Sequence, residues 1–329
     1  MWSSTVAFLV TLALSVLAAP LVTTAQPAGK LPRVGVLEPL HRQRPAGCMV
    51  AFQNALRDLG YVEGQTVVLD YRYAEGQPDR LPALAAELVR RAPDVLWTHS
   101  DAAAQAAGQA TTTIPIVVGL AIDLVQLGLA KSVARPGGNL TGLDLRPIEL
   151  AGKRLELFKA AVPTITRVAV LVDPSYTVHA SIPTAVEREA RALGVRLQPV
   201  EAGTPAAFEA AFAAMVRNRV DALMIMESAL LGTHREQITA LALRHRLPTM
   251  GFGRHYTEAG ALLSYGALPN ELCERSAVLV DKILKGAKPA DLPIEQAHKF
   301  PLVVNLKTAK ALRLTIPPSF LSRADDVIQ

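Results

Sequence analysis

Three neighbouring residues, His99, Ser100 and Asp101, have the side-chain types of a catalytic triad. A relay needs these groups to face one another across the fold, and adjacent residues at the end of a strand cannot do so. A helix is expected to begin here. Its free backbone N–H groups and its dipole can hold a ligand carboxylate, with the Ser100 hydroxyl as a further donor. The alternative is that Ser100 or Asp101 only caps its own helix.

Polar residues also follow the strands expected in the second half of the chain. Tyr176 can stack on a ligand, or it is an ordinary half-exposed loop aromatic. Glu227 can pair with a ligand ammonium, and Arg254 can hold a carboxylate through two hydrogen bonds. The alternatives are a solvated carboxylate for Glu227 and a salt bridge within its own domain for Arg254. The other strand-end residues expected to contact a ligand are Leu40, His41, Ala102, Asp123, Ser175, Ser228 and His255.

The sequence contains no catalytic or nucleotide-binding motif. Gly-x-Ser-x-Gly, the P-loop and Gly-x-Gly-x-x-Gly are all missing from it. The segment Gly251-Phe252-Gly253 follows a strand but lacks the third glycine. The seven histidines show no paired ligand spacing. We therefore expect no enzyme activity, no cofactor and no metal site.

Strand and helix patterns alternate from residue 32 onward, and the pattern occurs twice. In the first half, strands are expected near residues 33–37, 66–73, 94–97 and 114–118. In the second half, they are expected near 167–172, 196–200, 221–226 and 247–250. The alternation predicts an α/β protein with two Rossmann-like, doubly wound lobes. Because ligands bind outside the carboxyl ends of such strands, two lobes predict a ligand cleft between them.

The carboxy-terminal elements predict that the chain passes between the lobes several times. A strand is expected at 261–265, a helix at 270–285 and a strand at 299–305. We assign residues 31–146 and 266–296 to the first lobe, and residues 147–265 and 297–329 to the second. Several crossings restrict the two lobes to one closing motion about a hinge.

The first 25 residues have the pattern of a secretory signal peptide. An apolar run over residues 6–19 precedes a small-residue cleavage site at Ala25, although no Lys or Arg precedes the run. A membrane anchor is the alternative, but the run is short for a bilayer. We therefore expect a periplasmic protein. The net charge of +5 comes from interleaved charges, so no nucleic-acid partner is expected.

The sequence has two cysteines, Cys48 and Cys273, in two segments of helical pattern. Export would permit a disulfide bond between them. Buried free thiols are common in helices, however, and the sequence cannot supply the Cα distance that a bond requires. We favour two free thiols and leave the bond open.

Several segments together resemble the ABC transporter substrate-binding proteins of the tryptophan-binding-protein-like family. The resemblance covers the chain after the leader, and its segments are residues 59–65 (LGYVEGQ), 79–85 (DRLPALA), 134–142 (ARPGGNLTG), 152–156 (GKRLE), 280–286 (VDKILKG) and 305–310 (NLKTAK). It implies a type I periplasmic-binding fold and an exported, monomeric protein. Its implied partners are a small molecule of amino-acid-like or aromatic type, together with a membrane permease and its ATPase.

The resemblance and the missing motifs predict a non-catalytic solute-binding protein of an ABC importer. A periplasmic sensor that signals to a membrane receptor is the alternative, because the same fold serves both. The strand-end residues depart from the family pattern: His99-Ser100-Asp101 replaces Gly-Thr-Pro, and Leu124 replaces the proline that usually follows Asp123. Asp101 and the nearby histidines would suit a ligand with a hydrogen-bond donor or a cationic group.

Overall fold

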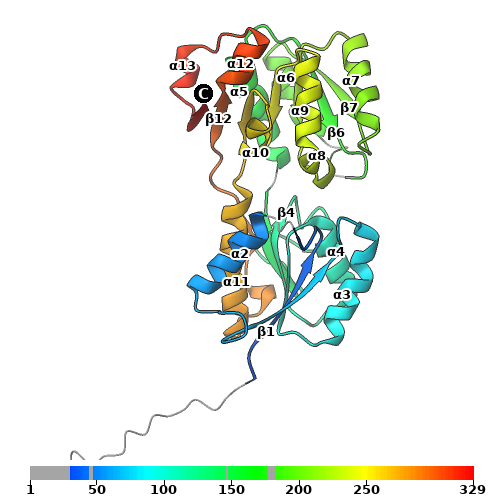
Figure 1. Cartoon of the computed structure of the whole chain (residues 1–329), viewed down its shortest axis with the longest axis vertical. Coiled ribbons are helices and arrows are strands. Elements are labelled where there is room, and N and C mark those ends of the chain that lie inside the picture. The colour runs from blue at the N-terminus through cyan, green and yellow to red at the C-terminus, as the bar shows by residue number, and fades with distance from the viewer. Residues whose placement is uncertain (1–29, 44–46, 146, 177–178, 180–181) are drawn as a thin grey trace, which may run out of the picture. The chain divides into compact units, whose positions relative to one another are not determined.

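The computed structural model describes residues 30–43, 47–145, 147–176, 179 and 182–329. The predicted signal peptide, residues 1–25, lies outside the described residues. Strands and helices alternate along the described chain and form two separate sheets (Figure 1). Within the described residues, no helix is long and apolar enough to cross a membrane.

The first sheet has six strands in the order β11-β5-β4-β3-β1-β2, all of them parallel. The strands are β1 (Arg33–Glu38), β2 (Val68–Tyr73), β3 (Val95–Thr98), β4 (Ile116–Ala121), β5 (Leu140–Asp144) and β11 (Glu295–Gln296). The helices beside it are α2 (Gly47–Asp58), α3 (Leu81–Arg90), α4 (Asp101–Ala110) and α11 (Pro269–Leu284). Helices α2 and α11 pack on each other, as do α3 and α4 (Figure 1).

The second sheet has seven strands in the order β13-β12-β10-β9-β8-β6-β7. The strands are β6 (Arg167–Val172), β7 (Arg196–Glu201), β8 (Ala222–Ile225), β9 (Thr249–Gly251), β10 (Leu263–Tyr265), β12 (Leu302–Asn305) and β13 (Asp326–Ile328). Its helices are α5 (Pro147–Ala161), α6 (Ile182–Ala192), α7 (Ala207–Arg217), α8 (Ala229–Thr233), α9 (Arg235–Arg244), α10 (Arg254–Glu258), α12 (Leu306–Leu312) and α13 (Pro318–Leu321). Strand β12 runs antiparallel to β10, a direction that the sequence pattern did not predict for this carboxy-terminal strand. It follows β11 of the first sheet in the chain, with no helix between the two strands.

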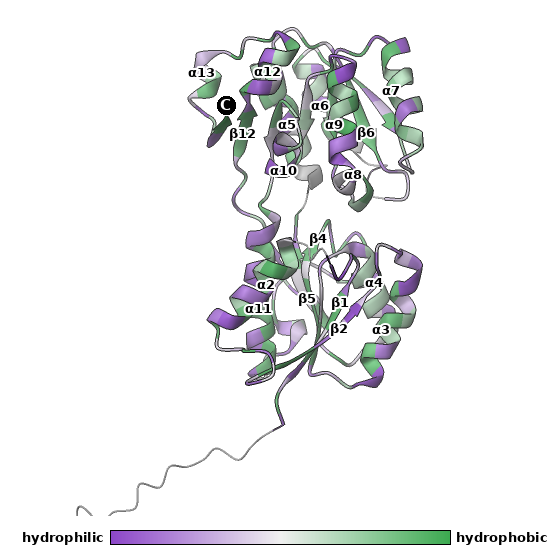
Figure 2. Ribbon diagram, in the orientation of Figure 1, coloured by the Kyte–Doolittle hydropathy of each residue, from purple (hydrophilic) through white to green (hydrophobic). Residues whose placement is uncertain are grey.

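Side chains alternate between the two faces of each sheet and build separate cores. In β1, Val34 and Val36 lie in one core with Phe52 of α2, while Leu37 lies in another with Leu81 of α3. Burial of each such side chain contributes about 1.5–3 kcal/mol to folding. Figure 2 shows the matching pattern on the helices, where hydrophobic and hydrophilic residues alternate along the chain. This two-faced burial explains the continuous apolar runs that predicted the strands.

Cys48 and Cys273 form a disulfide bond, so the expectation of two free thiols was wrong. The bond joins α2 to α11 across 225 residues of sequence, with 5.2 Å between the two Cα atoms. Both cysteines are buried between these helices. The pairing depends on a helix that returns to the first sheet from the carboxy-terminal part of the chain, and the local sequence does not contain that information.

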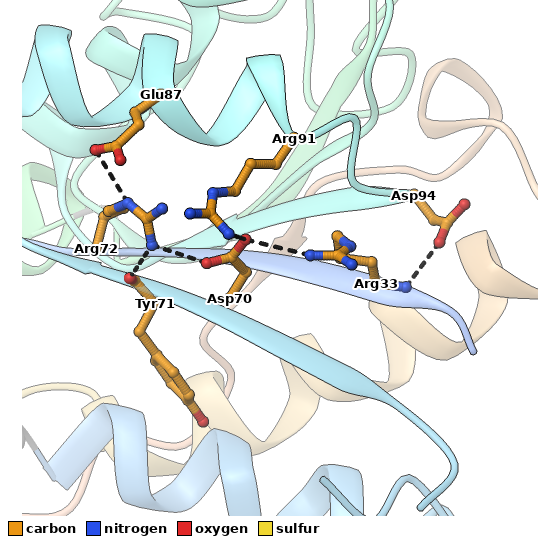
Figure 3. A network of polar contacts seen from close by, with 7 residues as sticks. All are labelled: Arg33, Asp70, Tyr71, Arg72, Glu87, Arg91 and Asp94. Atoms are coloured by element: carbon orange, nitrogen blue, oxygen red, sulfur yellow. Dashed lines mark hydrogen bonds and ion pairs between the residues drawn. The ribbon is translucent and has the colours of Figure 1, made fainter. Parts of the chain in front are cut away.

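Asp70 of β2 is the centre of a charged network on the first sheet (Figure 3). Its carboxylate lies within 2.8–3.4 Å of guanidinium nitrogens from Arg33, Arg72 and Arg91. Arg72 also pairs with Glu87 of α3 at 3.1 Å. Since β2 is an edge strand, this network ties the edge of the sheet to its neighbouring strand and helix.

Candidate ligand-binding site

Each sheet has a point at which the strand order reverses, and polar side chains follow the strands on both sides of it. In the first sheet the reversal lies between β1 and β3, and in the second between β6 and β8. The carboxyl ends of these four strands lead to Glu38, His99, Asp173 and Glu227. Ligands of open α/β sheets bind outside the strand ends at such points. These four residues and their neighbours therefore lie where a ligand of this fold is expected to bind.

In the first sheet, Glu38 and His99 form a hydrogen-bonded pair across the reversal point. The His99 Nε2 atom lies 2.9 and 3.0 Å from the two carboxylate oxygens of Glu38, and the Leu40 backbone N–H donates to the same carboxylate at 3.0 Å. Glu38 is fully buried and His99 is almost fully buried. The carboxylate thus holds the His99 ring in place. Because Nε2 faces Glu38, Nδ1 is the ring nitrogen left for another partner.

Ser100 and Asp101 begin α4, but they serve the protein itself in different ways. The Ser100 hydroxyl accepts the Ala103 backbone N–H at 3.2 Å, so Ser100 caps its own helix. Asp101 instead accepts the Ile122 backbone N–H through Oδ1 at 2.9 Å, which ties α4 to the end of β4. Its other oxygen, Oδ2, is buried and has no hydrogen-bond partner within the described residues. Burial, together with the nearby charge of Asp123, raises the pKa of Asp101 from 3.8 to about 6, although the Ile122 N–H opposes this shift.

His179 bridges the reversal point of the second sheet. The Asp173 backbone N–H donates to His179 Nδ1 at 3.0 Å, and Nε2 lies 3.0 Å from the Glu227 backbone oxygen. These contacts are consistent with a neutral ring that carries its proton on Nε2, and burial lowers the pKa of His179. The Asp173 carboxylate holds Ser175 through that residue's backbone N–H and hydroxyl. The ends of β6 and β8 are therefore joined by a histidine, as those of β1 and β3 are.

Glu227 lies among buried polar groups that are only partly satisfied. Arg154 Nε has no hydrogen-bond partner within the described residues, and Glu227 Oε2 and the Tyr256 hydroxyl have none beyond their interaction with each other. Burial raises the pKa of Glu227 from 4.5 to about 7, while the charge of Arg154 opposes this shift. Arg154 itself is fully buried, and its Nη2 donates to the backbone oxygens of Ile225 and Met250 at 2.6 and 3.3 Å. The guanidinium therefore holds the ends of β8 and β9 from within the lobe.

Tyr176 follows β6 and is half-buried. Burial is the largest cause of the rise in its pKa, and the negative charges of Asp101, Asp173 and Glu227 add to it. Asp101 begins α4, after strand β3 of the first sheet, whereas the other two follow strands of the second. Tyr176 thus lies within the electrostatic reach of acidic groups from both sets of strand ends.

Other predicted site residues make contacts that do not require a ligand. Arg254 is exposed and pairs with Glu258 and Asp326 of its own lobe, which is the alternative predicted for it. His41 is exposed and pairs with Glu75 at 2.9 Å. Ser228 is buried, and its hydroxyl caps α8 by accepting the Leu231 N–H.

The remaining predicted residues differ in exposure. His255 is half-buried, with Nε2 at 3.9 Å from Glu227 Oε2. Asp123 caps a turn by accepting the backbone N–H groups of Val125 and Gln126. Leu40 is half-buried, whereas Ala102 and Ser175 are exposed. For all the predicted residues, contact with a ligand stays a prediction.

Sequence reasoning did not select three residues of this arrangement as ligand contacts: Glu38, Arg154 and Tyr256. Glu38 ends β1 and begins the polar strand-end segment from which only Leu40 and His41 were selected. Tyr256 follows directly on the predicted pair Arg254 and His255, and its hydroxyl lies near Glu227. Arg154 lies in residues 152–156, one of the segments that carry the family resemblance, and an arginine within an apolar helical stripe was the available signal.

No group of three or more His, Cys, Asp or Glu side chains in the described part of the chain could hold a metal ion. A separate cavity of about 450 Å³ lies elsewhere, beside α11 and the segment that follows β11. Charged pairs line it, including Arg275 with Glu295 and Lys299 with Glu271. It contains none of the residues at the two reversal points.

The chain belongs to the ABC transporter substrate-binding proteins, since residues 33–328 match the model of that family. This confirms the resemblance, and membership in a solute-binding family agrees with the prediction that the protein is not an enzyme. Its similarity to a tyrosine-binding protein of Clostridioides difficile (strain R20291) is 26% identity over 262 residues, which cover 79% of this chain and 75% of that protein.

Solved structures confirm the two-lobed fold. A conserved domain protein from Vibrio cholerae O1 biovar eltor str. N16961 is 29% identical with a TM-score of 0.83, and the match covers 91% of this chain and all of that one. An ABC domain in complex with L-Trp from Streptococcus pneumonia has the same TM-score and coverage at 24% identity. The predicted pair of Rossmann-like lobes of the type I periplasmic-binding fold is therefore correct.

Proposed function

We propose that this protein is the extracytoplasmic solute-binding component of an ABC importer. A small molecule would bind between the first lobe, residues 31–146 and 266–296, and the second, residues 147–265 and 297–329. Closure about the chain segments that cross between the lobes would then present the loaded protein to a permease and its ATPase. Family membership supports the transport role. The names of similar proteins, one a tyrosine-binding protein and one solved with L-Trp, support an amino-acid-like or aromatic solute.

The observation that carries this proposal is the matching chemistry of the two reversal points. In each sheet a histidine joins the two strand ends, through Glu38 in one case and through the Glu227 backbone in the other. Near the first, Asp101 Oδ2 has no hydrogen-bond partner within the described residues, and near the second, Glu227 Oε2 has none beyond the Tyr256 hydroxyl. Buried polar groups are normally paired, so a bound molecule is a natural partner for both. We propose that His99, Asp101, Tyr176, Glu227 and His255 contact the solute.

Native mass spectrometry of protein purified from the periplasm of its own cells tests the proposal. We expect a polypeptide that begins at Gln26 and carries one small molecule, which is released when the protein unfolds. Retention of the solute should fall in the Tyr176→Ala variant, because a stacking partner is lost. The Arg244→Ala variant serves as a control, since Arg244 is exposed and pairs with the exposed Glu209. Protein that is always empty, and that no solute stabilises, would contradict the proposal.

A further inference from the structure

The unsatisfied groups at the two reversal points are mainly hydrogen-bond acceptors. Within the described residues, Asp101 Oδ2 has no hydrogen-bond partner and Glu227 Oε2 has none beyond the Tyr256 hydroxyl. Asp101 is 6% exposed, and the Glu227 side chain is 16% exposed. A buried acceptor without a donor costs about 1–3 kcal/mol, and more when it carries a charge. The fold maintains one such group at Asp101 and a partly satisfied one at Glu227, one near the strand ends of each sheet.

A separate group points to a missing partner beside Glu227. The Tyr256 hydroxyl is fully buried, and within the described residues it has no hydrogen-bond partner other than the Glu227 carboxylate. Burial and then the charge of Glu227 raise its pKa, so the hydroxyl keeps its proton and lies in the field of that carboxylate. A hydroxyl can donate one hydrogen bond and accept others. The proton of this hydroxyl interacts with the Glu227 carboxylate, and its acceptor capacity is left for a polar ligand group beside Glu227.

Three cationic or titratable side chains near these strand ends already interact with groups of the protein, and a fourth, Arg235, donates to the Gly232 backbone oxygen at 3.0 Å. Arg254 pairs with two carboxylates of its own lobe. Arg154 is fully buried beneath Glu227 and donates to two backbone oxygens. His255 is neutral near pH 7, because burial and the charge of Arg235 lower its pKa to about 4. Arg254 and His255 therefore offer no free positive charge to a ligand carboxylate, and the unpaired Nε of Arg154 is fully buried.

Of the two buried carboxylates, Asp101 is the one whose pKa shift has no cationic group among its causes. The charged group that acts most strongly on it is a second carboxylate, Asp123, which raises its pKa further. Its carboxylate is at the first turn of α4, where the helix dipole offers partial compensation. Glu227, by contrast, has the charge of Arg154 nearby. A cation from outside the protein would therefore gain most at Asp101.

We infer, on the basis of the proposed function, that the solute carries a protonated amine that donates to Asp101 and needs no carboxylate. Glu227 and Tyr256 would receive further N–H or O–H groups of the same molecule. Tyr176 lies in the field of Asp101 and Glu227, so its ring can cover the cation. The class of solute that fits is an aromatic monoamine, which lacks the carboxylate of the amino acids that similar proteins bind.

Isothermal titration of the full mature chain with six matched probes tests this inference. The amines are tyramine and tryptamine, the amino acids are tyrosine and tryptophan, and the acids are 3-(4-hydroxyphenyl)propionate and indole-3-propionate. Each set keeps the same ring and removes one charged group. We expect an amine to bind at least tenfold more tightly than its amino acid, and the acids not to bind. The Asp101→Asn variant should lose at least tenfold in affinity for the amine.

Two further variants keep the result interpretable. Asp58→Asn removes an exposed carboxylate at the end of α2 and should leave the affinity unchanged. If Asp101→Asn does not fold, Glu227→Gln removes the second buried carboxylate and should also weaken binding of the amine. Unchanged affinity in a folded variant of either kind would overturn the inference.

The remaining outcomes separate this inference from the proposed function. Tighter binding of the amino acids, or binding of the acids alone, would overturn the inference and leave the transport role standing. If no probe binds, the solute released in native mass spectrometry decides. An amine without a carboxylate would support the inference, and any other molecule would overturn it. Only a protein that binds no solute at all would overturn the proposed function as well.

Discussion

At the scale of single residues, Glu227 shows how the fold maintains a costly group. In water a glutamate has a pKa near 4.5, and burial raises the pKa of Glu227 to about 7 in the folded protein. Its surroundings contain the charges of Arg154 and Arg235, the Tyr256 hydroxyl and the neutral His255 ring. Folding therefore favours the protonated form. The resulting contribution to stability is fully present below about pH 4.5 and is lost as the pH rises through about 7.

Replacement of Glu227 by glutamine should remove this pH dependence. Below about pH 5 the free energy of unfolding of Glu227→Gln should resemble that of the natural protein. At pH 8 the variant should be more stable by about 1–3 kcal/mol, because it has no charge to bury. Urea unfolding at several pH values measures the difference. Glu201→Gln, at an exposed position at the end of β7, is the control and should show none. A variant less stable than the natural protein at pH 8 would contradict the argument.

The sequence predicted the strand-end residues better than their individual roles. His99, Asp101 and Glu227 follow the expected strands, because buried apolar runs end at visible polar residues. The capping by Ser100 and Ser228 was predicted only as an alternative for the first and not at all for the second. A cap and a ligand contact use the same residue types at the same position, so the sequence cannot separate them. Arg154 depends on a contact between α5 and the ends of β8 and β9, which no local pattern reveals.

At the scale of elements, the disulfide bond fixes α11 to α2. The chain leaves the first sheet after β5, builds most of the second sheet, and returns only at α11. The bond between Cys48 and Cys273 therefore closes a loop that contains the second lobe up to β10. Closure of so long a loop reduces the entropy of the unfolded chain. The sequence predicted both helices correctly but not the bond, which depends on how the two helices pack.

Loss of this bond should lower stability without changing the fold. We expect the Cys48→Ala/Cys273→Ala variant to lose about 2–4 kcal/mol in the free energy of unfolding. A reductant that opens the bond should lower the melting temperature of the natural protein and leave that of the double variant unchanged. Thiol titration of the denatured protein provides the check, since it should find no free thiol before reduction. Two titratable thiols, or equal responses to the reductant, would show that the bond is not formed.

At the scale of the whole molecule, three crossings connect the two sheets. The chain passes from β5 to α5, from β10 to α11, and from β11 to β12. The second crossing begins at Gly266, where an added Cβ would lie 1.7 Å from the Phe252 carbonyl oxygen. Only glycine fits there, so this crossing is packed against the loop after β9. The sequence predicted repeated crossings because extra elements followed the second half, but it could not predict this close contact.

Three parallel crossings permit hinge motion and oppose independent movement of the lobes. A solute that donates to Asp101 of one lobe and Glu227 of the other gains both contacts only when the lobes are close. It should therefore shift the population toward a closed form. Small-angle X-ray scattering should give a smaller radius of gyration for protein that retains its solute than for protein refolded without it. The Glu227→Gln variant should need more solute for the same decrease, whereas Glu201→Gln should not. Equal radii with and without bound solute would mean that binding does not close the lobes, and the importer would then need another signal to recognise the loaded state.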